Sequence, residues 1–319
     1  MSAALPKVVA IGGGTGLSVL LRGLKQKPLD ITAIVTVADD GGSSGRLRNE
    51  LQIPPPGDIR NVIVALSEIE PLFEKLLQYR FVNGNGLSGH SLGNLLLAAV
   101  TAITGDFARG VRELSRVLNV KGRVLPAANQ SIVLSAVMAD GTIVEGESNI
   151  PRHGEKIDRV FLTPEDVEPL PESLEAIREA DLIVLGPGSL YTSVLPNLLV
   201  PKLGVEICRA KAKKIYICNV MTQKGETDHF TAADHVKVLL DHTGPGCLDA
   251  VIVNEQPIPQ PVLERYAKEG AEPVLLDRER LSAYNLKIIS DNIVKIDDGG
   301  VIRHDERRLA DWIVRLLPV

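Results

Sequence analysis

The sequence predicts an α/β protein whose doubly wound, mostly parallel, Rossmann-like sheet carries a small β-hairpin insertion. Short apolar and β-branched runs alternate along the chain with longer segments of helical periodicity, and this alternation is typical of parallel βαβ units. Several of the apolar runs end directly in glycine-rich turns. A chain of 319 residues also buries enough surface to form a complete core without disulfides or metal ions. We therefore expect one α/β domain over residues 1–319.

The first half of the chain begins with two strand-and-turn units. Residues 7–11 have the pattern of a buried strand, residues 12–16 form a glycine turn, and residues 17–25 form a helix with apolar side chains at 17, 20, 21 and 24. A second strand is expected at 31–37, and it ends in another glycine turn at 39–45. Helical periodicity then recurs in four segments, at 58–67, 71–81, 91–104 and 106–118.

A change of pattern in the middle of the chain predicts the insertion. Asp140-Gly141 is a two-residue hairpin signal between the strand-like runs 131–139 and 142–148. Together with the run 157–162, these strands are expected to form a β-rich insertion at about residues 121–165.

Strands and helices alternate again after the insertion. Thr231 and Asp234 resemble a capping box at the start of one of these helices. Strands are expected at 182–185, 214–220 and 250–254, with helices near 190–199 and at 232–242. A last hairpin that turns at 297–300 and a closing helix at 305–317 complete the prediction.

Charge and composition exclude a dedicated nucleic-acid-binding protein. Lys and Arg number 35 against 40 Asp and Glu, for a net charge of −5, whereas a nucleic-acid-binding face requires an excess of cations. Aromatic residues make up 3% of the chain, too few for the stacking platforms that bind single strands. Nucleic acid is therefore not an expected partner.

The apolar segments predict neither a signal peptide nor a membrane span. The run 8–11 stops at three glycines. The run 92–103 is shorter than the ~20 residues that a span requires, and the run 182–201 is interrupted by Gly186-Pro187-Gly188 and Pro196-Asn197. We expect a cytoplasmic protein.

The cysteines and histidines show no metal-binding spacing. His235 and His242 lie on one face of an expected helix, seven residues apart, which favours a solvated helix face over a zinc site. The cysteines are odd in number and far apart, which favours buried thiols in a reducing compartment over a disulfide or zinc framework. They are Cys208, Cys218 and Cys247.

The turn Gly12-Gly13-Gly14-Thr15-Gly16 lies between an expected strand and the start of an expected helix. Glycines let a phosphate approach the backbone closely, and the helix N-terminus offers free N–H groups and a positive dipole. The turn matches neither standard phosphate motif, because Leu17 stands where the dinucleotide motif has glycine and no Gly-Lys-Ser/Thr follows. We favour an anion site here over a purely structural turn.

A second polar glycine turn, Asp39-Asp40-Gly41-Gly42-Ser43-Ser44-Gly45-Arg46, follows the next strand. Asp39 lies 25 residues beyond Gly14, close to the spacing at which an acidic residue binds a ribose hydroxyl in dinucleotide folds. Asp39 and Asp40 could instead hold one Mg²⁺ together. The side chains of Ser43, Ser44 and Arg46 suit a phosphate or diphosphate. An ordinary solvated turn is the alternative.

Two further polar segments open helices. Asp58 follows a run of three prolines and a glycine and is an expected N-cap, and Arg60 and Asn61 come after it either as ligand-binding or as surface residues. His90 and Asn94, in and after the next glycine-rich loop, are candidates to face a ligand. We interpret His90 either as a general acid or base or as a polar surface residue.

Strand ends in the second half carry polar turns as well. Gly186-Pro187-Gly188-Ser189 follows the strand at 182–185 and precedes a helix, as the first glycine turn does. Asn219 and Thr222 lie at the end of the strand at 214–220. Ligands of open α/β sheets bind outside the carboxyl ends of the strands. We therefore expect these turns to converge on one nucleotide-binding edge.

Seven segments spread over essentially the whole chain carry a resemblance to a known family. They are GGGTG, IVTVADDGGSSGRLR, PPPGDIRN, NGNGLSGHSLGN, GPGSLYTS, ICNVMTQ and VIRHD. With them, the chain resembles the CofD-like superfamily, specifically its bacterial gluconeogenesis-factor (YvcK-type) branch. The resemblance implies a Rossmann-like fold, a cytoplasmic location, and a regulatory role in growth on gluconeogenic carbon sources and in cell shape. It also implies binding of UDP-sugars such as UDP-N-acetylglucosamine.

The positions that match the family motifs imply roles for individual residues. Gly12–Gly16 and Gly186–Ser189 would hold phosphates, and Arg303 in the last segment would close over the diphosphate. The remaining matches assign Asp39 and Asp40 to ribose or a metal, and Asn219 and Thr222 to the base or sugar.

The leading hypothesis is a nucleotide-sugar-binding regulator with no catalytic residue assigned. The first alternative is a metal-dependent transferase of the 2-phospho-lactate type, which the related CofD branch contains, with Mg²⁺ as its cofactor. The second is an NAD-type dinucleotide-binding protein. Protein partners and homo-oligomer formation are left open.

Overall fold

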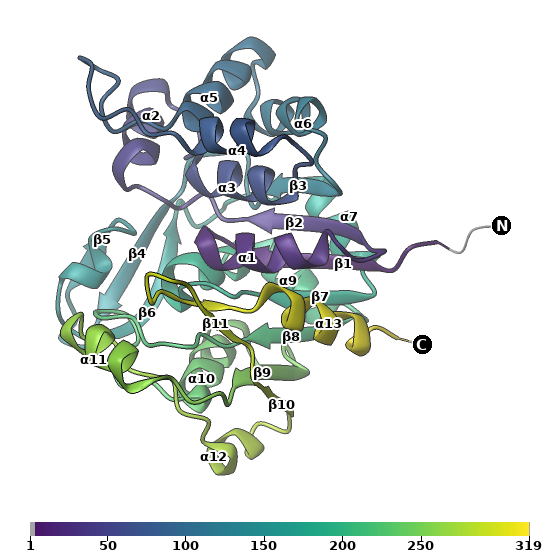
Figure 1. The fold of residues 1–319 in the computed structure, drawn as a ribbon, viewed down its shortest axis with the longest axis vertical. Coiled ribbons are helices and arrows are strands. Elements are labelled where there is room, and N and C mark those ends of the chain that lie inside the picture. The colour runs from purple at the N-terminus through teal and green to yellow at the C-terminus, as the bar shows by residue number, and fades with distance from the viewer. Residues whose placement is uncertain (1–3, 319) are drawn as a thin grey trace.

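A seven-stranded parallel sheet forms the centre of the protein (Figure 1). The computed structural model describes residues 4–318. The strands lie in the order β10-β9-β8-β7-β1-β2-β3, and every neighbouring pair is parallel. Their bounds are β1 Lys7–Gly12, β2 Asp30–Val35, β3 Arg123–Pro126, β7 Leu182–Leu185, β8 Lys213–Ile217, β9 Ala250–Asn254 and β10 Lys287–Asp291. The predicted fold class is confirmed.

The central strands are apolar without alternation because helices cover both of their faces. All four residues of β7 are buried, as are the last five of β1. Val8 of β1 pairs with Ile31 of β2 on one side and with Leu182 of β7 on the other. The hydrophobic core therefore surrounds the middle of the sheet.

The strand order has its switch point between β1 and β7, where the direction in which the chain adds strands reverses. From β1 the chain adds β2 and β3 on one side, and from β7 it adds β8, β9 and β10 on the other. Crossovers between parallel strands are right-handed, so helices that follow β1 and β7 cover opposite faces of the sheet. Just beyond the carboxyl ends of β1 and β7, the loops diverge to the two faces and leave a crevice, which is where such folds bind ligands.

Thirteen α-helices surround the sheet in the described part of the chain. Helix α1 packs against α3 and α13, and Figure 1 shows α1 and α13 in front of the strands. The helices are α1 Gly14–Leu24, α2 Gly42–Leu51, α3 Gly57–Leu66, α4 Pro71–Gln78, α5 Leu92–Thr104, α6 Phe107–Val117, α7 Pro171–Arg178, α8 Leu195–Leu198, α9 Pro201–Arg209, α10 Ala232–Thr243, α11 Gln260–Lys268, α12 Arg278–Ser282 and α13 Glu306–Leu316. Two short helical turns are η1 Ile150–Arg152 and η2 Leu190–Val194.

Two small antiparallel sheets lie outside the central one. Strands β4 Val133–Met138, β5 Ile143–Glu145 and β6 Ile157–Thr163 form a three-stranded sheet. Strands β11 Val294–Ile296 and β12 Ile302–His304 form a hairpin. The antiparallel strands of the insertion are confirmed, but Arg123–Pro126, within the range expected for it, forms the edge strand β3 of the central sheet instead.

The glycine turn expected at 39–45 is in part a helix. Helix α2 begins at Gly42, and the Gly45 amide donates to the Gly41 carbonyl at 3.0 Å. Residues 46–51 (RLRNEL) contain good helix formers, and they extend the helical turn backwards into the glycine segment. The predicted glycine turn over 39–45 is therefore correct only up to Gly41, where the helix takes over.

The cysteine prediction is wrong for two of the three residues. Cys208 and Cys247 form a disulfide, with their Cα atoms 4.3 Å apart, whereas Cys218 is a buried thiol as expected. The two partners lie 39 residues apart in sequence, and such a pairing cannot be deduced from spacing.

The histidines of α10 also differ from the expectation of a solvated helix face. His235 is fully buried, and its Nδ1 donates to the Thr231 carbonyl at 2.9 Å. The His242 ring is half-buried, and its Nε2 accepts from the Val160 amide at 3.2 Å. This face of α10 therefore packs inward. The capping box of Thr231 and Asp234 is confirmed.

Between residues 4 and 318, none of the helices combines the length and apolar character needed to cross a membrane.

Candidate functional site

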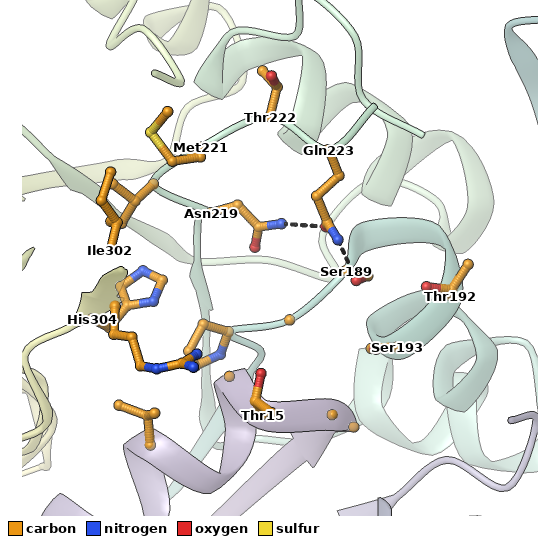
Figure 2. A pocket seen from close by; sticks show the side chains of 18 of the residues that line it. Thr15, Ser189, Thr192, Ser193, Asn219, Met221, Thr222, Gln223, Ile302 and His304 are labelled. Carbon is orange, nitrogen blue, oxygen red and sulfur yellow. Dashed lines mark hydrogen bonds between the residues drawn. The ribbon is translucent and has the colours of Figure 1, made fainter. Parts of the chain in front are cut away.

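A cavity of about 480 Å³ opens at the carboxyl ends of β1, β7 and β8. It lies at the point where the strand order reverses, as expected for the ligand crevice of a doubly wound sheet. Figure 2 shows several of the side chains that line it. The cavity has three chemically different parts: a glycine cradle, an apolar wall and a carboxyl wall.

The glycine cradle consists of Gly13–Gly16 and Gly188. Gly14 has a φ of +64°, a backbone conformation that side chains other than glycine rarely adopt. A Cβ on Gly16 would lie 2.5 Å from the Pro187 carbonyl oxygen, so the first turn of α1 and the loop after β7 are in direct backbone contact. Gly13, the N-cap of α1, has no side chain to cap the helix, and the Asp58 carboxyl accepts a hydrogen bond from the Gly14 amide. The other amides of the first turn and the helix dipole face the cavity and favour an anion.

Hydroxyl and amide side chains border the cradle. The Ser193 side chain is 8% exposed and lines the cavity, and no hydrogen bond of its hydroxyl is found within residues 4–318. Gln223 donates to the Ser189 hydroxyl at 2.7 Å and accepts from the Asn219 amide at 3.1 Å, as Figure 2 shows. This chain of contacts joins the end of β7 to the loop after β8.

The apolar wall consists of Val220, Met221, Tyr266 and Ile302. Val220 and Met221 form a small hydrophobic cluster with β11, and the other two side chains pack against it. The Tyr266 hydroxyl accepts from the Ile302 amide at 2.9 Å, which fixes the ring against the β11–β12 hairpin. A flat, partly apolar group such as a nucleobase suits this wall.

His304 and Arg303 project from the same hairpin. The His304 Nε2 lies 3.1 Å from the Cys218 carbonyl, and burial lowers the pKa of the ring to about 4. Because a carbonyl only accepts, Nε2 donates and Nδ1 is left as an acceptor. Arg303 is the one Lys or Arg among the described residues that line the cavity. It also borders a second cavity of about 400 Å³, where Asn61 lies.

The carboxyl wall consists of Asp39, Asp58 and Glu147. Burial and the neighbouring Asp39 raise the pKa of Asp58 to about 7, against the lowering effects of the Gly14 amide, which hydrogen-bonds to the carboxyl, and of Arg60. Burial and the surrounding carboxyls raise the pKa of Glu147 to about 8. These shifts mean that Asp58 and Glu147 are partly protonated near neutral pH.

Asp58 does not cap its own helix as predicted. It lies inside the first turn of α3, which begins at Gly57. A Cβ on Gly13 would lie 2.5 Å from an Asp58 carboxyl oxygen. The carboxyl therefore stands at the N-terminus of α1, a different helix, because the absence of a side chain at Gly13 leaves room for it.

The two adjacent aspartates do not converge on one cation. An Asp39 oxygen accepts from the Gly41 amide at 2.9 Å, and an Asp40 oxygen accepts from the Ser148 amide at 2.9 Å. Over residues 4–318, no three His, Cys, Asp or Glu side chains are grouped so that they could hold a metal ion. The residues present do not fit a Mg²⁺ site built on this pair, and we assign no step to a metal.

Several of the predicted polar residues form a buried network beside the cavity. The Ser43 hydroxyl lies 2.9 Å from the His90 Nδ1 and accepts from the Asn94 amide at 3.1 Å. Arg60 donates to the Asn94 carbonyl oxygen at 3.2 Å and also to Gln78. His90 is 3% exposed, so it is not a surface residue. The network joins α2, α3 and α5 without lining the cavity.

The structure brings together about half of the residues predicted to bind a ligand. Those that line the cavity are Gly13, Gly14, Thr15, Gly16, Asp39, Asp58, Gly188, Ser189, Asn219, Thr222 and Arg303. Those that do not are Gly12, Asp40, Gly41, Gly42, Ser43, Ser44, Arg46, Arg60, Asn61, His90, Asn94 and Gly186. The ligand role of each residue stays a prediction.

Sequence reasoning missed several residues of the cavity. Gln223 and His304 lie inside the family-like segments ICNVMTQ and VIRHD, so their signal was present. Glu147 follows β5 in the insertion, and Tyr266 lies on α11; neither belongs to one of the glycine turns predicted to bind a ligand. Only the tertiary fold brings these two to the cavity.

Comparisons with known proteins give a consistent family relationship. The CofD family, described as 2-phospho-L-lactate transferase CofD, matches residues 8–294. A protein of Bacillus subtilis named gluconeogenesis factor is 64% identical over 312 residues, covering 98% of both chains. A protein of the same name from Halalkalibacterium halodurans is 63% identical, covering 98% of this chain and 96% of the relative.

A solved structure has the same fold. The X-ray crystal structure of a protein from Bacillus halodurans aligns with a TM-score of 0.96 at 63% sequence identity. The alignment covers 98% of this chain and 100% of that one.

Proposed function

This chain belongs to the CofD family, and we propose that it is a nucleotide-sugar-binding regulatory protein that supports growth on gluconeogenic carbon sources. The observation that carries the proposal is the joint presence of a glycine cradle and an apolar wall in one cavity at the switch point of the sheet. A nucleoside diphosphate needs both of these surfaces. The names of two close relatives, from Bacillus subtilis and Halalkalibacterium halodurans, support the physiological role.

The proposal matches each part of the ligand to one part of the cavity. The base lies against Met221, Tyr266 and Ile302, where Asn219 and Gln223 offer amide groups to its polar edge. The diphosphate lies on the free amides at the start of α1, with the Arg303 guanidinium over it. An Arg beside a diphosphate donates several charge-assisted hydrogen bonds at once.

We assign the protein to the cytoplasm, and we extend its role to cell shape as the resemblance of its motifs implies. UDP-sugars such as UDP-N-acetylglucosamine are the ligands that we expect. Such a regulator reports the level of its ligand, so it binds the nucleotide sugar and leaves it intact.

A transferase is the second candidate, because the family description names a 2-phospho-L-lactate transferase. In that case, the cavity would bind an activated nucleotide and release a nucleoside phosphate. The two candidates differ in whether the ligand is recovered unchanged.

Calorimetric titration with UDP-N-acetylglucosamine, UDP-glucose, GTP and NAD, with and without Mg²⁺, tests the proposal. We expect a UDP-sugar to bind most tightly, without a need for Mg²⁺, and to be recovered unhydrolysed. Formation of a product in the presence of the metal would favour the transferase. Absence of binding by any of the four at millimolar concentration would contradict both.

A matched pair of variants locates the binding. Arg303→Ala removes the cation of the cavity and should weaken UDP-sugar binding at least tenfold, because charge-assisted contacts to the diphosphate are lost. Arg307→Ala removes an exposed guanidinium of α13 outside this cavity and should leave affinity unchanged. Equal effects of the two substitutions would place the ligand elsewhere.

A further inference from the structure

The cavity has a third part that neither the base nor the diphosphate accounts for. The apolar wall belongs to the loop after β8 and to the β11–β12 hairpin, on one side of the cradle. Asp39 follows β2 and Asp58 opens α3, on the opposite side of β1. A nucleotide whose base lies on the apolar wall and whose diphosphate lies on the cradle therefore directs its third group toward the carboxyl wall.

The carboxyl wall consists of acidic side chains and contains no basic one. Its three carboxyls come from three separate elements: the ends of β2 and β5 and the start of α3. A fourth carboxyl, Glu226, lies behind them, 8% exposed, and accepts from the Thr192 hydroxyl at 3.3 Å. The buried Arg60 is held by Asn94 and Gln78 and does not line the cavity.

Carboxyl groups in this arrangement recognise hydroxyl groups. An ionised carboxylate accepts hydrogen bonds from two or more hydroxyls, and a protonated one also donates one. Ser193 of η2, which is 8% exposed and whose hydroxyl has no hydrogen bond among the described residues, adds a further group that faces the same ligand. A neutral, hydroxyl-rich group satisfies all of these side chains without adding charge.

We propose that Asp39, Asp58 and Glu147 select the group beyond the diphosphate: they accept a neutral sugar and exclude one that carries an acid group. This inference rests on the proposed function, since it concerns the sugar of the nucleotide sugar. It predicts that UDP-glucose binds and that UDP-glucuronate, which differs only by a carboxylate in place of a hydroxymethyl group, binds poorly.

The expected discrimination is large at alkaline pH. Two like charges about 4 Å apart in a partly buried site repel by enough to weaken binding at least tenfold. Below pH 7 the discrimination shrinks, because protonation of Asp58 and Glu147, whose pKa values are raised to about 7 and 8, neutralises part of the wall.

The other charged groups around the carboxyl wall do not reverse the expected loss of discrimination at low pH. Asp40 and Glu226 add negative charge next to Glu147 and favour its protonated form. Arg48 lies close enough to Asp39 and Asp40 to interact with both. Arg60 interacts with Asp58 and Asp39 but has its hydrogen bonds committed to neighbouring amides.

The test is a set of calorimetric titrations of the full chain with UDP-glucose and UDP-glucuronate in EDTA, at pH 6 and pH 8.5. We expect UDP-glucuronate to bind at least tenfold more weakly at pH 8.5, and the ratio to fall by threefold or more at pH 6. Asp58→Asn and Glu147→Gln together should bring the ratio at pH 8.5 within threefold. Asp166→Asn, an exposed carboxyl outside the cavity, should leave the ratio unchanged.

The wild-type titrations decide the question even where a variant folds poorly. Equal affinity for the two sugars in EDTA would overturn the inference while leaving the proposed function intact. The inference would also be overturned if binding required Mg²⁺ and the two sugars then bound equally well, because the carboxyls would then hold a cation. Failure of both sugars to bind would instead overturn the proposed function and the inference with it.

Discussion

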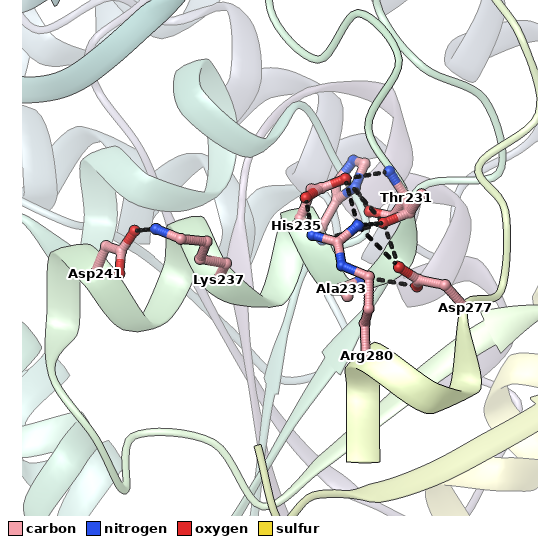
Figure 3. A network of polar contacts seen from close by, with 8 residues as sticks. Thr231, Ala233, His235, Lys237, Asp241, Asp277 and Arg280 are labelled. Carbon is pink, nitrogen blue, oxygen red and sulfur yellow. Dashed lines mark hydrogen bonds and ion pairs between the residues drawn. The ribbon is translucent and has the colours of Figure 1, made fainter. Parts of the chain in front are cut away.

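Two groups of carboxylates in this protein have opposite environments. At the start of α10, Asp234 and Asp277 accept hydrogen bonds from Thr231 and from the Arg280 guanidinium, in the network of Figure 3. At the cavity, the three residues of the carboxyl wall have no guanidinium or ammonium partner among the described residues. The same chemical group is therefore satisfied in one place and left available in the other.

The pKa shifts record this difference. Partial burial raises the pKa of Asp234, but hydrogen bonds from Arg280 and Thr231 outweigh this effect and lower the pKa to about 2. Burial and neighbouring carboxyls raise the pKa of Glu147 to about 8. Perturbed carboxyls that line a cavity without a partner indicate a functional site more strongly than paired ones do. Carboxyls with complete partners belong to the fold.

Removing a paired carboxyl should affect stability most. Asp234→Ala removes half of the capping box and the partner of Arg280. Loss of a cap costs about 1 kcal/mol, and with the lost ion pair we expect Tm to fall by about 3–6 °C. UDP-sugar affinity should stay unchanged. Differential scanning calorimetry and titration check the two halves of this prediction, and a loss of affinity would contradict the structural role.

Removing the unpaired carboxyls of the cavity should instead make the protein more stable at alkaline pH. Asp58 and Glu147 have pKa values raised above those of the unfolded chain, so the folded state binds more protons. Their contribution to stability is complete below about pH 4 and is lost as the pH rises through 7 and 8. Asp58→Asn with Glu147→Gln should raise Tm at pH 8.5 by about 2–4 °C.

Melting curves of the wild type and the variants at two pH values test whether Asp58 and Glu147 cause this pH dependence of stability. The double variant should lose the alkaline part of the pH dependence, whereas Asp166→Asn should keep it. A double variant less stable than the wild type at pH 8.5 would mean that the wall belongs to the fold after all.

The acid side of the stability profile should depend weakly on the paired cluster. The pKa of Asp234 is lowered in the folded state, so its contribution is present above about pH 4 and is lost as the pH falls through 2. Asp234→Asn should flatten the fall in stability at acid pH. This effect should be smaller than that of the double variant at alkaline pH, because solvent partly screens the Asp234 side chain. Acid titration followed by circular dichroism measures it, and an unchanged acid limb would contradict the pairing.

The same contrast explains how much of the site was predictable from the sequence. The glycine cradle and Asp39 were found because glycine turns at strand ends have a local signature that one sequence displays. Glu147 was missed because its neighbours are decided by how the insertion folds back, which places Ser148 on Asp40, a residue 108 positions earlier. The capping box of Thr231 and Asp234 was found because its spacing of three residues is local.

The fold itself was predictable from alternating strands and helices, and each of its exceptions has a physical cause. Helix α2 extends into the glycines after β2, and β3 joins the central sheet through pairing with β2. The disulfide of Cys208 and Cys247 depends on a tertiary approach that spacing does not encode. For β3 and the disulfide, a long-range contact decided what a short pattern left open.

A crystal structure of the full chain with UDP-glucose tests the central claim most directly. We expect the base on Met221 and Tyr266, the diphosphate on the amides of Thr15 and Gly16, and sugar hydroxyls within hydrogen-bond distance of the carboxyl wall. A sugar bound in the second cavity beside Asn61, or a diphosphate away from the start of α1, would contradict the account.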